Sequence, residues 1–177
     1  IAFVLGYFLA VIEAKRHKIS ANFVSDFLFY LIPICIIGAR TYYVVFEFEE
    51  YKNSLLEIFM VWKGGLAIHG GILFGLVFLL FYTKKHKVNS LKFMDIAAVS
   101  LVIGQAIGRW GNFFNQEAYG PETSFEFLKS LHIPNFIIEN MYKNGVYYQP
   151  TFLYESLGCL IIFIILLIIR RMKFAKN

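Results

Sequence analysis

The chain has 177 residues, of which 58% are hydrophobic, 19% are aromatic and only 16% are charged. This balance is far more apolar than a soluble domain needs, so it excludes an ordinary soluble protein and indicates an integral membrane protein. The formal net charge of +5 does not imply a nucleic-acid partner, because the basic residues follow a membrane pattern that is described below.

The first apolar segment, residues 1–12, is too short to cross a hydrocarbon layer of about 30 Å at about 1.5 Å per residue. It begins at Ile1, with no initiator methionine and no charged leader before it. We therefore expect the sequence to be a fragment whose first spanning segment is cut short.

Four further apolar segments follow, at residues 23–46, 66–82, 93–110 and 151–169. We expect an all-α, polytopic membrane helical bundle with about five transmembrane segments, which form one transmembrane domain over residues 1–177. The polar stretch 119–149 is expected to form an outward-facing loop or a small extramembrane element. Cys35 and Cys159 lie inside apolar segments without metal-ligand spacing, so we expect them to serve packing and expect no metal or other cofactor.

Basic and acidic residues alternate between successive connections. Eleven of the seventeen basic residues fall in every second connection, at Lys15, Arg16, Lys18, Lys84, Lys85, Lys87, Lys92, Arg170, Arg171, Lys173 and Lys176. The intervening loops carry carboxylates, at Glu47, Glu49, Glu50, Glu57, Glu122, Glu126 and Glu139. This asymmetry sets the basic loops on the cytoplasmic side. Arg40, His69, the stretch 108–120 and Glu155 are then expected near the outer face.

His69 is flanked by glycines at positions 64, 65, 70 and 71. Glycine lets the backbone approach a ligand closely or adopt positive φ, and histidine exchanges a proton near neutral pH. The alternative is a glycine motif for helix packing, with the histidine hydrogen-bonded to a neighbour.

Arg109 lies where an apolar segment gives way to polar residues. Arg109, Asn112 and Gln116 share a face if the helix continues, and a guanidinium suits phosphate oxygens. Ionisable groups in membrane segments are candidates for function. The alternative is an internal ion pair of Arg109 with Glu117 or Glu155 that only ties helices together.

Four other residues are assigned lesser roles. Arg40 is either a second cation of the same site or an anchor to lipid phosphates. Asp95 lies near the start of its segment, where a carboxylate interacts favourably with the helix dipole. Tyr154 and Glu155 lie at the start of the last segment, after Pro150, a position suited to helix initiation. Glu155 is also a candidate to complete the site. No P-loop, nucleophile elbow or dinucleotide fingerprint is present in the sequence, so we expect a substrate that resides in the bilayer.

Three motifs are distinctive: residues 108–120 read GRWGNFFNQEAYG, residues 64–71 read GGLAIHGG, and residues 150–155 read PTFLYE. The first resembles the signature Gly-Arg-x-Gly-Asn-Phe-x-Asn-x-Glu-x-x-Gly of the bacterial prolipoprotein diacylglyceryl transferases. The other two resemble two further motifs of that family, in the family's order. The similarity extends over essentially the whole chain.

The resemblance implies transfer of the diacylglyceryl group from phosphatidylglycerol to the lipobox cysteine of prolipoproteins, at the outer face of the bacterial plasma membrane, with release of glycerol phosphate. It implies that Arg109 binds the phosphate and stabilises the leaving group, and that His69 is the general base for the thiol. Asn112, Glu117 and Gly120 would shape the headgroup site, with support from Asp95, Tyr154 and Glu155.

Family members have seven transmembrane helices, and the last two carry a further arginine-bearing motif that this sequence, ending at Asn177, is expected to lack. Two alternatives to the transferase are therefore open. One is a phospholipid-binding or transport protein without chemistry, and the other is an inactive truncated remnant.

Overall fold

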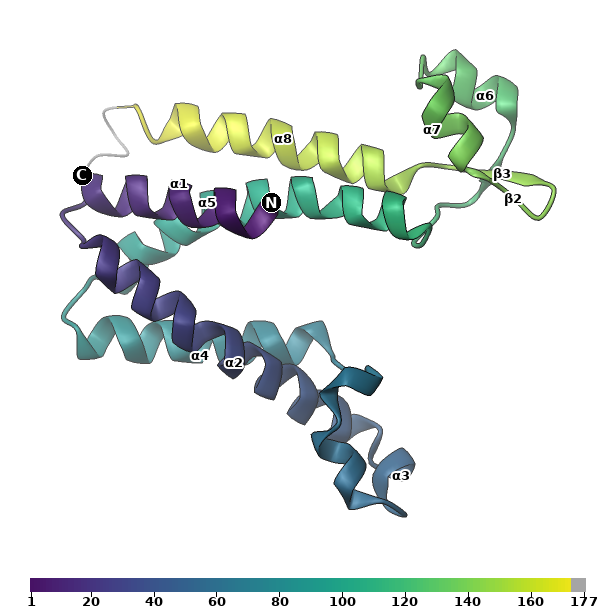
Figure 1. The fold of residues 1–177 in the computed structure, drawn as a ribbon. Helices are drawn as coiled ribbons and strands as arrows, with labels where there is room; N and C mark the ends of the chain where they lie inside the picture. The colour runs from purple at the N-terminus through teal and green to yellow at the C-terminus, as the bar shows by residue number, and fades with distance from the viewer. Residues whose placement is uncertain (173–177) are drawn as a thin grey trace. The chain divides into compact units, whose positions relative to one another are not determined.

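The computed structural model describes residues 1–172, and Figure 1 shows its helices and strands. In chain order these are α1 (Ala2–Arg16), α2 (Ala21–Phe46), α3 (Phe48–Tyr51), the 3₁₀ helices η1 (Leu55–Phe59) and η2 (Val61–Lys63), α4 (Ile68–Lys85), α5 (Ser90–Asn115), β1 (Glu122–Thr123), α6 (Phe125–Ser130), α7 (Asn135–Asn140), β2 (Tyr142–Lys143), β3 (Val146–Tyr148) and α8 (Thr151–Ile169).

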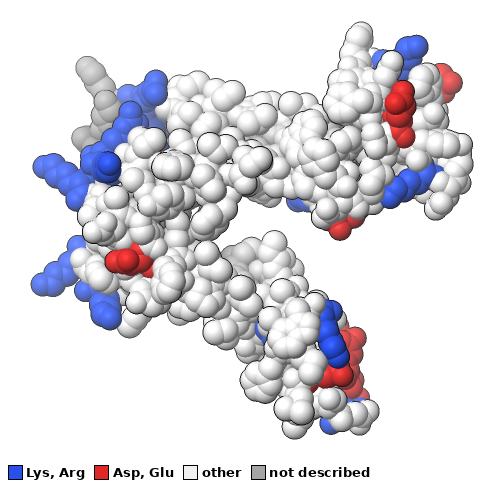
Figure 2. Space-filling view, in the orientation of Figure 1, with Lys and Arg blue, Asp and Glu red and all other residues white. Residues whose placement is uncertain are grey.

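Within the described residues, four helices are long and apolar enough to cross a membrane, namely α2, α4, α5 and α8. The surface of these helices between their ends is almost free of charge in Figure 2. The expected all-α, polytopic membrane architecture is confirmed, whereas the expected number of about five segments is approximate. The first predicted segment corresponds to α1, which has 15 residues. Lys173 and Lys176 of the basic pattern lie outside the described residues.

The chain divides into two compact units. Unit 1 comprises Ile1–Ala10 and Ala97–Asn177, and unit 2 comprises Val11–Ile96. That the whole chain acts as one transmembrane domain stays a prediction.

In unit 2, helices α2 and α4 cross where two glycines face each other. A Cβ atom at Gly38 would lie 2.5 Å from Phe74 Cβ and 2.7 Å from the Gly70 carbonyl oxygen, and one at Gly70 would overlap the Gly38 carbonyl and Tyr42 Cβ. Small residues let two membrane helices approach closely, because dispersion contacts replace the hydrophobic effect as the driving force. Nearer the basic ends of these helices, the rings of Phe23, Phe27, Tyr82 and Phe93 pack together in the buried core.

Gly70→Ala is expected to separate α2 from α4 and to destabilise the protein in detergent by about 1–3 kcal/mol, the range for overpacking a filled site. The matched control is Gly71→Ala, because a Cβ at Gly71 meets only ordinary contacts, at 3.4 Å from the Cys35 carbonyl oxygen. Resistance to unfolding by a denaturing detergent measures both variants. Equal losses in the two would show that the crossing is not as close as described.

In unit 1, side chains join α5 to the first turns of α8. The indole Nε1 of Trp110 donates to Ser156 Oγ at 3.2 Å, and Ser156 Oγ in turn donates to the Ala106 carbonyl at 2.8 Å. The rings of Phe113 and Phe152 lie 4.8 Å apart between centroids. Ala106, Trp110 and Phe113 recur at helical spacing and therefore form one face of α5.

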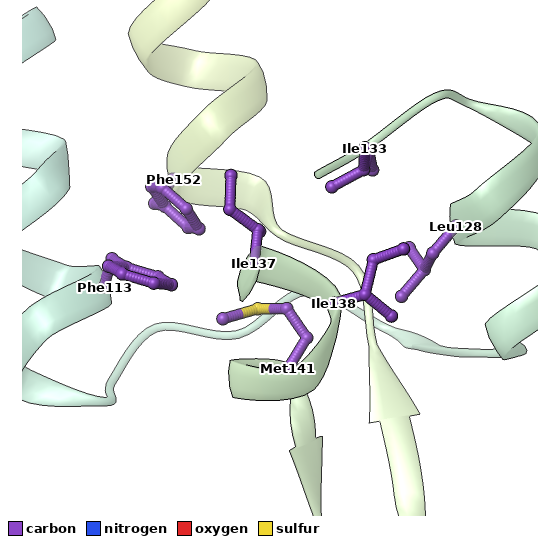
Figure 3. Close-up of a cluster of buried hydrophobic side chains, with 7 residues drawn as sticks. All are labelled: Phe113, Leu128, Ile133, Ile137, Ile138, Met141 and Phe152. Atoms are coloured by element: carbon purple, nitrogen blue, oxygen red, sulfur yellow. The ribbon is translucent and has the colours of Figure 1, made fainter. Parts of the chain in front are cut away.

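The predicted outward loop is an ordered cap made of α6, α7 and a small antiparallel sheet in the order β1-β3-β2. Strands β2 and β3 are joined by Asn144 and Gly145, whose φ angles of 51° and 85° suit the tight turn of a β-hairpin. Figure 3 shows the core of the cap, a cluster of buried side chains from α5, the cap and α8. Its members are Phe113, Leu128, Ile133, Ile137, Ile138, Met141 and Phe152.

Ile138→Ala is expected to destabilise the cap by about 2–5 kcal/mol, because it removes three carbons from a site with no exposed surface and leaves a cavity. Leu131→Ala is the control, since the Leu131 side chain is 46% exposed. Hydrogen exchange of amides in residues 122–149 measures the loss. Similar protection in the two variants would contradict a packed core at Ile138.

Candidate functional site

Helix α5 continues beyond the predicted end at residue 110 and stops at Asn115. It ends because Gln116 has a φ of 57°, and the amides of Gln116 and Glu117 donate to the carbonyls of Phe113 (3.2 Å) and Asn112 (3.0 Å). This pair of bonds is the Schellman arrangement of a helix C-terminus. Arg109 and Asn112 therefore occupy the last turns of α5. Gln116 lies outside the helix, so the predicted common face of Arg109, Asn112 and Gln116 does not extend to Gln116.

Arg109 forms an ion pair with α8, with its Nε 2.5 Å from Glu155 Oε2. Of the two carboxylates proposed as partners from the sequence, Glu155 is therefore the one that pairs. Within residues 1–172, Nη1 and Nη2 of Arg109 form no hydrogen bond, and the side chain is 33% exposed. The two terminal nitrogens thus form an open edge of donors, which is the edge that binds a phosphate or carboxylate group in a bidentate manner.

Glu117 accepts hydrogen bonds from two asparagine amides instead of pairing with Arg109. Its Oε1 lies 3.2 Å from Asn112 Nδ2 and 3.3 Å from Asn115 Nδ2. These bonds hold Asn112 against the turn that ends α5. The amide oxygen of Asn112 forms no hydrogen bond to the described residues.

A second network, which the sequence did not reveal, fixes the turn that follows α5. The ammonium of Lys143 in β2 donates to the Gln116 carbonyl at 2.7 Å and lies 4.4 Å from the centre of the Tyr119 ring. The Gln116 side chain accepts from the Tyr119 hydroxyl at 3.0 Å and donates to Asn140 Oδ1 at 3.2 Å. No sequence signal identifies this contact, because residues 119–149 contain two lysines, Lys129 and Lys143, and a backbone carbonyl is the same at every position.

Gly120 lies where the chain passes against the start of α8. Its amide donates to the Gln149 carbonyl at 2.9 Å, and a Cβ at this position would lie 2.7 Å from Thr151 Cγ2. Close packing thus accounts for a glycine here. That Gly120 also shapes a headgroup site stays a prediction.

In unit 2, His69 occupies the first turn of α4 and is exposed. Its ring is stacked with that of Tyr42, with 6.0 Å between centroids, and its imidazole forms no hydrogen bond to any residue between 1 and 172. Of the flanking glycines, Gly64 and Gly65 have φ angles of 92° and 69°, which glycine adopts readily. Gly70, in contrast, serves the helix crossing.

Arg40 is buried in unit 2, with 6% of its surface exposed. Its Nε donates to the Ile58 carbonyl (2.8 Å), Nη1 to the carbonyls of Gly64 (2.8 Å) and Gly65 (2.9 Å), and Nη2 to the carbonyl of Glu57 (2.5 Å). That Arg40 contacts substrate stays a prediction, and in this structure its donors face backbone oxygens.

The remaining candidates lie apart from these contacts. Asp95 is exposed on α5 within unit 2, and Tyr154 is 37% exposed on α8, next to Glu155. Cys35 and Cys159 are free, partly buried thiols. Residues 1–172 contain no group of three histidine, cysteine, aspartate or glutamate side chains that could hold a metal ion.

An apolar groove on α2 and α4 in unit 2 does not include His69. It is lined by Ile34, Leu73, Phe74, Val77, Phe78 and Phe81. On membrane-spanning helices such a groove suits an acyl chain, and its lining carries no side chain that could act on one.

The comparisons with known proteins agree with the motifs. A family model described as prolipoprotein diacylglyceryl transferase matches residues 1–177. The chain is 50% identical over 176 residues to a phosphatidylglycerol–prolipoprotein diacylglyceryl transferase of Listeria monocytogenes serotype 4b, a match that covers 99% of this chain and 64% of the relative. A transferase of the same name from Halalkalibacterium halodurans is 47% identical over 174 residues, covering 98% of this chain and 60% of the relative.

A third transferase of this name, from Enterococcus faecalis, is 47% identical over 167 residues, which are 94% of this chain and 60% of the relative. The chain thus spans 60% to 64% of the length of these curated relatives. Because the family model covers every residue from 1 to 177, the chain belongs to the prolipoprotein diacylglyceryl transferase family.

Proposed function

We propose that the protein transfers the diacylglyceryl group of phosphatidylglycerol to the lipobox cysteine thiol of prolipoproteins, at the membrane face away from the cytosol. The names of the relatives support both substrates. The apolar helices support a site within the bilayer, where the lipid substrate resides.

In the reaction, the cysteine sulfur forms a bond to the glycerol carbon that carries the phosphate. The bond between that carbon and the phosphate oxygen breaks, and its electron pair leaves with glycerol phosphate. The thiol proton passes to a base and then to solvent, so the products are a thioether and glycerol phosphate, and no cofactor takes part.

The observation that carries the proposal is the open edge of Arg109. Glu155 holds Nε at 2.5 Å, and the two terminal nitrogens form no hydrogen bond within residues 1–172. Because Glu155 fixes the guanidinium, its free donors are already in place to bind a phosphate before the reaction begins. Such donors stabilise the negative charge that grows on the leaving group.

His69 is the proposed base. Its imidazole is exposed and forms no hydrogen bond to the described residues, so a ring nitrogen is available to accept a proton from an incoming thiol. Since the thiolate is the nucleophile, a base within hydrogen-bonding reach raises the rate.

The remaining predicted residues shape or support the site. Asn112, which Glu117 holds at 3.2 Å, is proposed to use its free amide oxygen to accept hydrogen bonds from the glycerol hydroxyls of the headgroup. Glu117 and Gly120 fix the turn beside it, Glu155 orients Arg109, and Tyr154 and Asp95 play supporting roles.

A transfer assay tests this function. The chain is reconstituted in vesicles containing phosphatidylglycerol and incubated with a synthetic lipobox peptide, and the thioether product is measured by mass spectrometry. The expected result is a product that requires phosphatidylglycerol and a free cysteine. Binding of phosphatidylglycerol without any product would instead favour a lipid-binding protein, and the absence of both would favour an inactive remnant.

A further inference from the structure

Arg40 is a charged side chain buried in a membrane-spanning helix, and backbone oxygens occupy most of its donors. A guanidinium has five N–H groups, and Arg40 uses four of them on four carbonyls. Within residues 1–172 no carboxylate forms an ion pair with it. The Tyr51 ring covers it, with 4.9 Å from Cζ to the ring centre. One N–H is left for any other ligand.

The four carbonyls belong to the two ends of one stretch of chain, residues 57–65, which contains η2. Glu57 and Ile58 form the first end, and Gly64 and Gly65 form the second. Gly65 has a φ of 69°, and a Cβ at this position would overlap Nη1 of Arg40 and lie 2.9 Å from the Tyr51 hydroxyl. The guanidinium therefore joins the two ends of the stretch, and the glycine leaves room for it.

The same part of α2 also fixes the start of α4. The Ala67 amide donates to the Ala39 carbonyl at 3.0 Å, immediately before α4 begins at Ile68. Tyr42 places its ring against that of His69. Residues 39, 40 and 42 of α2 thus contact the stretch that leads into His69 and the histidine itself.

We propose that Arg40 is a positioning residue, which holds residues 57–65 by their carbonyls and so sets the start of α4 and the orientation of His69. This inference rests on the proposed function of His69. It gives Arg40 a role different from that of a phosphate ligand, since bidentate binding of a phosphate would require the guanidinium to leave carbonyls that already compensate its buried charge.

A tryptophan in residues 57–65 can report on this stretch by its fluorescence. Trp62 lies in this stretch, within η2, and is 76% exposed. The chain has two tryptophans, Trp62 and Trp110. In a Trp110→Phe background, the fluorescence of Trp62 therefore reports on the stretch alone.

Arg40→Met removes the donors and keeps an apolar side chain in the site. Hydrogen exchange of amides 57–70 is expected to become at least about tenfold faster, because the loss of even one hydrogen bond from a charged donor shifts a local opening equilibrium by about that factor. The emission of Trp62 is expected to shift. Lys63→Met is the matched control. Lys63 lies in the same stretch but is exposed, with its Nζ 3.4 Å from Glu57 Oε1, so neither readout should change.

Kinetics separates positioning from phosphate binding. In the transfer assay, Arg40→Met is expected to lower kcat by about a hundredfold, as misplacement of a reacting group does, with the KM for phosphatidylglycerol almost unchanged. Arg40→Lys, which retains the charge and some donors, should recover part of both the rate and the exchange protection.

Two results would overturn the inference. One is unchanged exchange at residues 66–70 in Arg40→Met, and the other is a rise in KM with kcat preserved, which would make Arg40 a ligand of the lipid. If the unsubstituted chain forms no product, the proposed function fails, while the exchange of amides 57–70 still decides whether Arg40 holds the start of α4.

Discussion

Arg109→Gln is expected to lower the transfer rate by about 10²–10³, the loss that follows removal of one donor that stabilises charge in a transition state. The protein should still insert and fold, because Trp110, Ser156, Phe113 and Phe152 continue to join α5 to α8. The measurement is kcat and KM for phosphatidylglycerol in vesicles, with hydrogen exchange of the cap as the test of folding. Arg109→Lys should recover little, since an ammonium lacks the planar fork.

Two controls separate binding of the phosphate from a purely structural ion pair. Glu155→Gln removes the charge of the partner and leaves the guanidinium, so it should cost less than Arg109→Gln if the arginine acts on the substrate. Arg16→Gln breaks an ion pair of 2.8 Å with Glu13 that has no proposed role, and it should leave the rate unchanged. Equal losses for Arg109→Gln and Glu155→Gln would mean that the pair only joins two helices.

His69→Gln is expected to lower kcat by about 10²–10⁴, the contribution of a general base, and to change the KM for phosphatidylglycerol little. The deficit should shrink as the pH rises towards the ordinary pKa of the substrate thiol, about 8.5, because solvent then forms the thiolate without the imidazole. Rates measured with the lipobox peptide between pH 6 and 9 test this expectation.

The control for His69 is His17→Gln, the same substitution at an exposed histidine in the loop after α1. It should behave as the unsubstituted chain does. A His69 variant that loses rate and lipid affinity in equal measure, with a deficit that does not depend on pH, would exclude the base and favour a role in binding the headgroup.

The apolar segments of the sequence predicted well which parts of the chain form membrane helices, but they predicted the residues at which the helices end less well. Helix α8 occupies the predicted range 151–169, whereas α5 continues five residues beyond its predicted end at residue 110, to Asn115. Residues 111–115 are a glycine, two asparagines and two phenylalanines, so the end of the predicted apolar segment does not mark the end of the helix. The positive φ of Gln116 ends it, and a glutamine carries no sequence signal for that conformation.

Partners of buried polar groups were the least predictable part of the site. The sequence proposed Glu155 as one of two carboxylates for Arg109, because helix ends limit which charges can meet. It gave no indication that Arg40 would bind carbonyls of residues 57–65, since backbone oxygens are the same at every position of a chain. The hydrogen bond from Lys143 to the Gln116 carbonyl was missed for the same reason.

The contacts that join α5 to α8 have a consequence for where residues can be inserted in the chain. Arg109 is held to α8 by contacts within residues 106–113 and 152–156, whereas the turn at Asn144 and Gly145 lies at the far end of a hairpin. Added residues at that turn would lengthen the hairpin without altering the ion pair. This position should therefore accept insertions of different length and composition, and it is a suitable place for an affinity tag or a fluorescent label.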